Sequence, residues 1–279
     1  MSDPRQLATL DAEAFATKIP AILRSTKDAD FEENEDLQLI KSRATEPPAV
    51  KAISSILTLP IEEDDFDNLE LHQRVLYSIV SALSFEQLQS YRPALRTLAS
   101  FDISGFKSRS SHYAQTMHLI NNAKLLEQFA ADREAIWLPI NKFDHISDRT
   151  LSERVHTAEQ MRPYMHGLFN WQVDFCHPVF GDCRKQLARF PETAAAVAAE
   201  VMYMAVNDIE HQHYLIDFVS ECVPIGEAWI PMRTPVQEMV RSLEGKSKED
   251  LEDDGEDGYL DEAKEWLAKL EKWEASQVS

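Results

Sequence analysis

Residues 191–223 read PETAAAVAAEVMYMAVNDIEHQHYLIDFVSECV, and this stretch indicates the fold class of the chain. Stepping by three and four residues from Val197 gives a mostly apolar row that continues to Cys222, whereas the opposite face carries Glu200 and Glu210. An apolar stripe of this period is typical of an amphipathic helix with one buried face. We therefore predict one long helix over this stretch, beginning at its first proline, where a missing amide hydrogen is tolerated.

Similar helical periods recur along the chain, among them a segment over 148–176. Only 7 of the 279 residues are glycine, whereas average usage of about 7% would give roughly 20, so left-handed turns and β-hairpins are scarce. We expect an all-α fold with one bundle-like core domain over residues 5–243. Eight acidic residues in 244–258 predict a flexible acidic linker, and the period in 259–275 predicts a C-terminal amphipathic helix.

Charge and composition exclude several classes of protein. The chain has 28 Lys and Arg residues against 48 Asp and Glu residues, a formal charge of −20, which would repel a nucleic-acid backbone. No secretory signal and no apolar run of membrane-spanning length are found, so we expect no membrane partner. An odd number of cysteines argues against a disulfide framework. Together these features predict a cytoplasmic protein.

The apolar stripe of the predicted 191–223 helix is interrupted at one level by polar side chains. Asp208 and His211 lie three residues apart on it, with Gln212 beside them, and side chains at this spacing meet on a helix. A carboxylate and an imidazole on a buried face need partners, because an unpaired buried charge is costly. We expect either a structural pair or a site, with Asp208 and Gln212 as catalytic residues and His211 as the metal ligand.

The segment 148–176 and the residue after it supply possible partners for this level. His166 and His177 are further candidate ligands, and Trp171 and Phe175 would line a flat apolar cavity. Imidazole ligands between helices suit haem or another iron site. The sequence thus predicts a small-molecule oxidoreductase that uses iron, with haem favoured over non-haem iron.

Two motifs suggest other metal chemistry. Glu153 with His156, and Glu210 with His213, form ExxH strings that resemble the ligand pairs of ferritin-like di-iron sites, although the helical period places Glu210 on the solvated face. The acidic string EEDDFD at residues 62–67 resembles the Asp-rich motif of class I terpene cyclases, which implies a magnesium diphosphate site. A second such motif would begin at Asn207 and Asp208, but it departs from the pattern at His211 and Leu215.

A cofactor-free helical scaffold is the main alternative to an enzyme. In this interpretation the polar residues of the stripe are structural, and the acidic runs steer a basic partner protein. The C-terminal helix either docks on the core domain or carries its apolar face to a partner.

Overall fold

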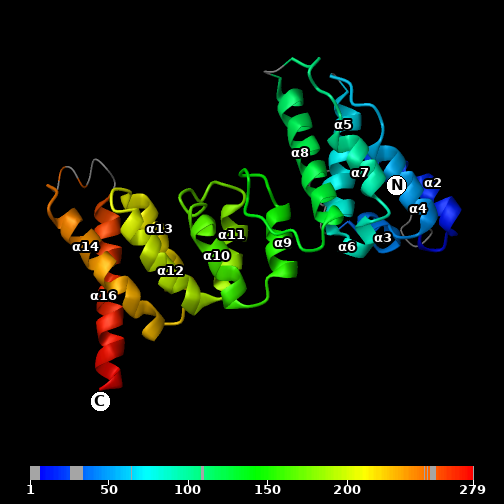
Figure 1. The fold of residues 1–279 in the computed structure, drawn as a ribbon. Helices are drawn as coiled ribbons and strands as arrows, with labels where there is room; N and C mark the ends of the chain where they lie inside the picture. The colour runs from blue at the N-terminus through cyan, green and yellow to red at the C-terminus, as the bar shows by residue number, and fades with distance from the viewer. Residues whose placement is uncertain are drawn as a thin grey trace. The chain divides into compact units, whose positions relative to one another are not determined.

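The computed structural model describes residues 7–25, 34–63, 65–107, 110–247, 249, 251 and 256–278, and every element within these residues is helical (Figure 1). The predicted all-α fold is confirmed. The chain divides into two compact units, Met1–Ala135 (unit 1) and Ile136–Ser279 (unit 2). This division falls inside the range 5–243, where the sequence pattern indicates no linker. Among the described residues, none of the helices is both long and apolar enough to cross a bilayer.

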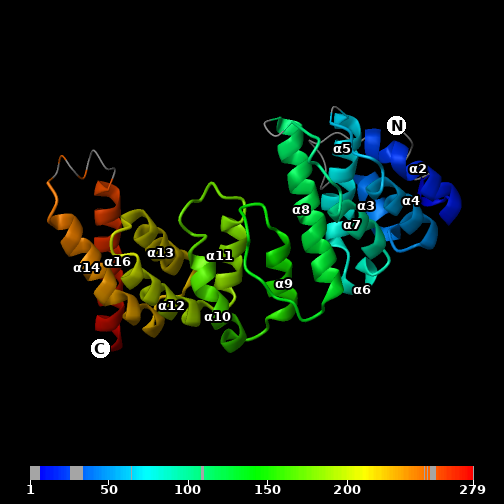
Figure 2. The ribbon, with the colours of Figure 1, turned by 45° about the horizontal axis from the view of Figure 1, so that its top comes forward.

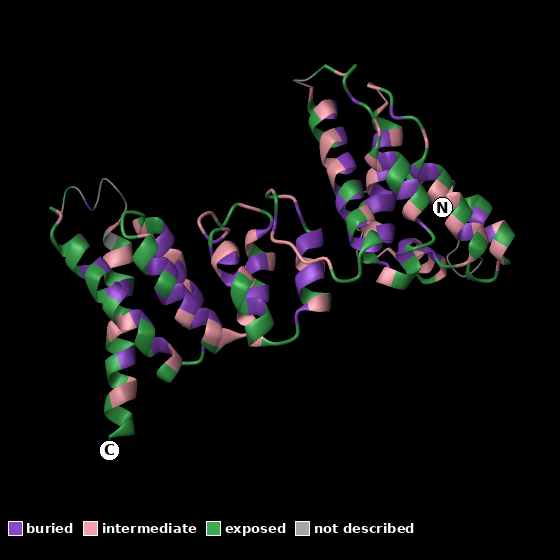
Figure 3. Ribbon diagram, viewed as in Figure 1, coloured by how far each residue is buried: buried purple, intermediate pink, exposed green. Residues whose placement is uncertain are grey.

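Unit 1 is built from short helices around an apolar core. Capping side chains begin several of them: Asn34 accepts a hydrogen bond from Leu37 N at 3.1 Å, and Ser110 accepts one from Tyr113 N at 3.0 Å. The buried faces turn toward one another (Figure 3). Its described elements are α2 (Ala12–Ser25), α3 (Glu35–Arg43), α4 (Pro47–Leu57), α5 (Phe66–Gln73), the π-helical η2 (Arg74–Ile79), the 3-10 helix η3 (Val80–Ala82), α6 (Phe85–Leu88), α7 (Arg92–Ala99) and α8 (Ser111–Ala131).

Unit 2 is a series of helices that alternate in direction. The turns at 170–179 and 205–208, the C-terminal end of α14 and the start of α16 lie together at one end of the helices (Figures 1 and 2); we call this the turn end. Its described elements are α9 (Ile146–Arg154), α10 (Ala158–Phe169), α11 (Phe180–Ala188), α12 (Pro191–Met204), α13 (Ile209–Cys222), the 3-10 helix η4 (Glu227–Met232), α14 (Arg233–Glu244) and α16 (Asp257–Gln277).

Two of the predicted helices are each divided in the structure. The predicted helix over 191–223 is α12 and α13 separated by a turn at 205–208, and the predicted helix over 148–176 is α9 and α10, after which 170–179 is irregular. Both predictions were wrong because a period of three and four residues stays in phase with the next helix when it is counted across the three residues at 155–157 or the four at 205–208. Each short helix has its own buried stripe, and the two stripes happen to align in sequence.

The C-terminal helix α16 packs within unit 2, against α13 and α14. Its apolar face buries Ala263, Trp266 and Leu270, and the Trp266 ring stacks on Trp229 with ring centroids 4.8 Å apart and planes 5° from parallel. Lys264 Nζ pairs with a Glu244 carboxylate at 2.8 Å. Of the two alternatives for this helix, the structure shows the docked one.

The predicted linker over 244–258 is only partly described. Residues 248, 250 and 252–255 lie outside the described residues. In the remainder, Leu251 is buried and the Lys246 ammonium pairs with the Glu256 carboxylate. Leu251 of the acidic segment therefore packs in the apolar core of unit 2, and the segment is not fully solvated.

Candidate functional site

The turn between α12 and α13 holds the residue that the sequence places at the centre of the site. Asp208 is the N-cap of α13, and its Oδ1 accepts a hydrogen bond from the backbone amide of His211 at 3.0 Å. Aspartate is a favoured N-cap because it satisfies an amide that the helix itself leaves unpaired. Asp208 is exposed at the start of α13. The prediction that it lies on a buried stripe is therefore wrong. Asp208 contacts the His211 backbone, and no hydrogen bond joins the two side chains.

His211 and Gln212 are both buried, as the helical period predicts. His211 Nε2 lies 3.1 Å from the carbonyl oxygen of Phe169. Because a carbonyl only accepts, His211 Nε2 is the protonated nitrogen that donates in this contact. Gln212 Nε2 donates to the carbonyl of Met202 at 3.2 Å. Both side chains thus connect α13 to the ends of neighbouring helices.

Three of the other expected cofactor residues have hydrogen-bond or ion-pair partners other than His211 and Gln212. His166 is partly buried and pairs with Glu200 on α12, with Nε2 and Oε2 2.9 Å apart. His177 and Trp171 lie in the irregular segment after α10, where Trp171 Nε1 donates to the Pro139 carbonyl at 3.2 Å.

Phe175 does not have the burial that lining a haem pocket requires. Phe175 is 68% exposed, so it lines no buried cavity. His177 Nε2 lies 3.4 Å from the Asp174 carboxylate. In the described part of the chain, no three His, Cys, Asp or Glu side chains are grouped to hold a metal ion. Iron binding stays a prediction, which the absorption spectrum and the iron content of the purified protein would test.

The two weaker motifs have structural partners. Glu153 accepts from Arg149 Nε at 2.9 Å, and His213 Nδ1 lies 3.1 Å from Glu262 on α16. In the acidic string at 62–67, Asp65 is the N-cap of α5, with its Oδ1 3.0 Å from Asn68 N. Residue 64 of that string lies outside the described residues. These contacts account for the motifs as helix caps and ion pairs.

An open groove of about 640 Å³ lies at the turn end of unit 2. Its walls come from the 205–208 turn, the start of α13, the end of α14 and the start of α16, and they carry the carboxylates of Asp208, Glu210 and Glu256. Among the described residues that line the groove, only Lys246 is basic, and it is paired with Glu256. Burial raises the pKa of Tyr259 in this groove, and the Glu210, Glu262 and Glu256 carboxylates raise it further. The groove is thus electronegative.

Apolar side chains are exposed next to the groove. Tyr203, Met204 and Val206 are all more than half exposed, although they lie within four consecutive residues. A single exposed apolar side chain is ordinary on a protein surface, whereas a local group of this kind marks interaction sites. The groove therefore offers both negative charge and an apolar rim.

A smaller cavity of about 40 Å³ adjoins the groove and shares Val206 and Ser242 with it. Gln212, only 3% exposed, lines this cavity. Its Oε1 is buried and has no hydrogen-bond partner. Glu238 and Ser242 of α14 line the same cavity.

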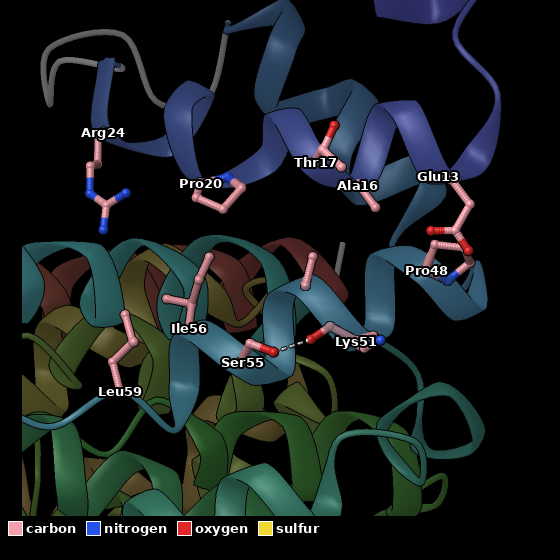
Figure 4. A pocket seen from close by; sticks show the side chains of 11 residues that line it. Glu13, Ala16, Thr17, Pro20, Arg24, Pro48, Lys51, Ser55, Ile56 and Leu59 are labelled. Carbon is pink, nitrogen blue, oxygen red and sulfur yellow. Dashed lines mark hydrogen bonds between the residues drawn. The ribbon is translucent and has the colours of Figure 1, made fainter.

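Unit 1 has a groove of its own, about 440 Å³ in volume, between α2 and α4 (Figure 4). Ala16 and Pro20 of α2 face Ile56 of α4 across it, and Arg24 and Glu13 lie toward opposite ends. Its lining residues include no buried polar atom without a partner. This groove therefore has less to specify a ligand than the turn end of unit 2.

The sequence pattern indicates Asp208 and Gln212, which line the groove and the small cavity. It does not indicate four other lining residues, Glu238, Ser242, Glu256 and Tyr259. The missed residues come from α14 and α16, and a sequence period says nothing about which helix ends meet in space. The available signal was the Asn-Asp pair at 207–208, because both residue types favour N-caps over helix interiors.

Comparison with known proteins gives one match. Residues 137–267 match the family model described as a domain of unknown function, DUF5071. No curated protein and no solved structure matches the chain. The matched region lies within unit 2 and ends inside α16, so the groove, the small cavity and the first part of the docked helix lie in the region that resembles this family.

Proposed function

We propose that unit 2 is a protein-interaction module that binds a basic segment of a partner protein at its turn end. The single observation that carries this proposal is the electronegative groove lined by Asp208, Glu210 and Glu256, with exposed apolar residues beside it. Complementary charge steers a basic partner toward such a surface and suppresses acidic ones.

The apolar rim explains how such binding becomes specific. Charge at an exposed surface contributes only about 0–1 kcal/mol per pair, so affinity needs apolar anchors as well. Tyr203 and Met204 supply these anchors, because aromatic residues and methionine are enriched at interfaces. A basic segment with flanking apolar residues is therefore the occupant that fits both parts of the groove.

The described residues give the iron-dependent oxidoreductase less support. Three of its expected residues have protein partners: His211 the Phe169 carbonyl, His166 the Glu200 carboxylate and Trp171 the Pro139 carbonyl. These contacts hold helices and turns together, which is the role that the scaffold alternative assigns to them.

A selection of phage-displayed random peptides on the full chain tests the proposal. The enriched peptides should be basic and apolar, and their binding should weaken roughly tenfold in the double variant Asp208→Asn with Glu210→Gln. Asparagine caps a helix as well as aspartate does, so the first change removes charge without removing the N-cap.

The matched control removes the same charge at other exposed sites of unit 2, with Glu227→Gln and Glu271→Gln. Peptides should bind this control as they bind the unaltered chain. Enrichment of acidic peptides, or equal weakening by both double variants, would show that the groove is not the binding site. Failure to enrich any peptide would also overturn the proposal.

A further inference from the structure

We infer that the small cavity beside the groove receives the ammonium group of a lysine side chain, so that the module distinguishes lysine from arginine. This inference rests on the proposed function, because the lysine would belong to the basic segment in the groove. The observation behind it is the buried, unpartnered Oε1 of Gln212.

The orientation of the Gln212 amide is fixed by its other contact. Nε2 donates to the Met202 carbonyl at 3.2 Å, and exchanging the two amide atoms would place two acceptors against each other. Oε1 is therefore the atom left without a donor, on a side chain that lines the cavity. A buried acceptor without a donor is costly, so this position favours an occupant that donates a hydrogen bond.

The number of acceptors matches an ammonium. Glu238 and Ser242 line the same cavity, and with Gln212 they offer three acceptor groups, one of which is a carboxylate. An ammonium has three donors, whereas a guanidinium has five in a rigid plane. Lysine would therefore be satisfied here, while arginine would keep donors without partners.

The size and the walls of the cavity agree with this assignment. Its volume of about 40 Å³ has room for only a few water-sized groups, at roughly 10–15 Å³ each. Met202, Pro235 and Met239 give it apolar walls, which suit the methylene stem of lysine. The groove lies next to the cavity through Val206 and Ser242, so a side chain can enter from a bound segment.

The test uses three capped peptides that differ only in a central lysine, arginine or norleucine residue, flanked in each case by leucines and arginines. Titration calorimetry on the full chain should show the lysine peptide binding at least about tenfold more tightly than the other two, about 1.4 kcal/mol. Glu238→Gln and Ser242→Ala, which alter exposed residues, should each reduce this preference. Gln212→Met should abolish it.

The outcomes separate the inference from the proposed function. The lysine and arginine peptides could bind equally tightly, with the binding of both weakened in the Asp208→Asn, Glu210→Gln variant. The groove would then bind basic segments without a lysine in the cavity. This result overturns the inference but not the proposed function. If no peptide binds, or the groove variant weakens none, the proposed function fails together with the inference. A lysine preference unchanged in Glu238→Gln, Ser242→Ala and Gln212→Met would place the selectivity elsewhere and overturn the inference.

Discussion

Asp144 shows how one buried carboxylate can organise a segment that sequence periods leave undefined. It is 1% exposed and accepts four hydrogen bonds, from Trp137 Nε1 and Ile140 N at 3.2 Å, Ile146 N at 3.1 Å and Ser147 N at 3.0 Å. It thus joins the irregular start of unit 2 to the first turn of α9. No helical period points to this residue, because it precedes α9 and two of its donors, Trp137 and Ile140, lie in a loop.

Replacing this carboxylate should destabilise unit 2. We expect Asp144→Ala to lower the free energy of unfolding by about 3 kcal/mol, because it leaves several buried donors unpaired. The five tryptophans of the chain all lie in unit 2, so urea unfolding followed by tryptophan fluorescence reports this unit. Asp261→Ala, at an exposed position on α16, should change the midpoint little. Equal midpoints for both variants would refute the assigned role of Asp144.

At the scale of elements, the sequence predicted that the C-terminal segment is an amphipathic helix but not what covers its apolar face. The stripe of Ala263, Trp266 and Leu270 was visible in the sequence. Its partner Trp229 lies in a short 3-10 helix without a stripe of its own. Periodicity identifies a face that needs burial, but the complementary surface is assembled from several elements only after folding.

The docking of α16 depends most on the tryptophan stack. Trp266→Ala removes a fully buried ring, so we expect a loss of about 3–5 kcal/mol and faster amide hydrogen exchange throughout 257–277. Trp273→Ala is the matched control, because Trp273 is only partly buried on the same helix, and its effect should be much smaller. Unchanged exchange in Trp266→Ala would mean that other contacts hold the helix.

At the scale of the whole molecule, the fold class was predictable and the division of the chain was not. Scarce glycine and repeated helical periods suffice for an all-α fold, because both act locally. The boundary at Ala135 and Ile136 depends on which helices pack together, and the sequence around it resembles other helix-connecting loops. The groove was missed for the same reason, since four separate elements form it.

The stability of unit 1 should depend on pH through His72. Its ring is fully buried, and burial lowers its pKa below the usual value of 6.5. Below that value the unfolded chain binds a proton that the folded unit does not, so stability should fall as the pH drops from about 6.5, by at most about 1.4 kcal/mol per pH unit.

Hydrogen exchange in α5 at a series of pH values measures this dependence, and His72→Gln should flatten it between about pH 6.5 and pH 5. His156→Gln, which alters an exposed histidine of unit 2, should leave it unchanged. A pH profile in α5 that is the same with and without His72 would assign the dependence to other groups.

The central claim is that the turn end of unit 2 binds a basic segment, and mapping the bound peptide on the full chain tests it most directly. Hydrogen exchange with and without a selected basic peptide should show protection at residues 203–210, 242–247 and 256–259, with unit 1 unaffected. Protection in α2 and α4, around the groove of Figure 4, with none at the turn end, would contradict the claim and assign binding to unit 1.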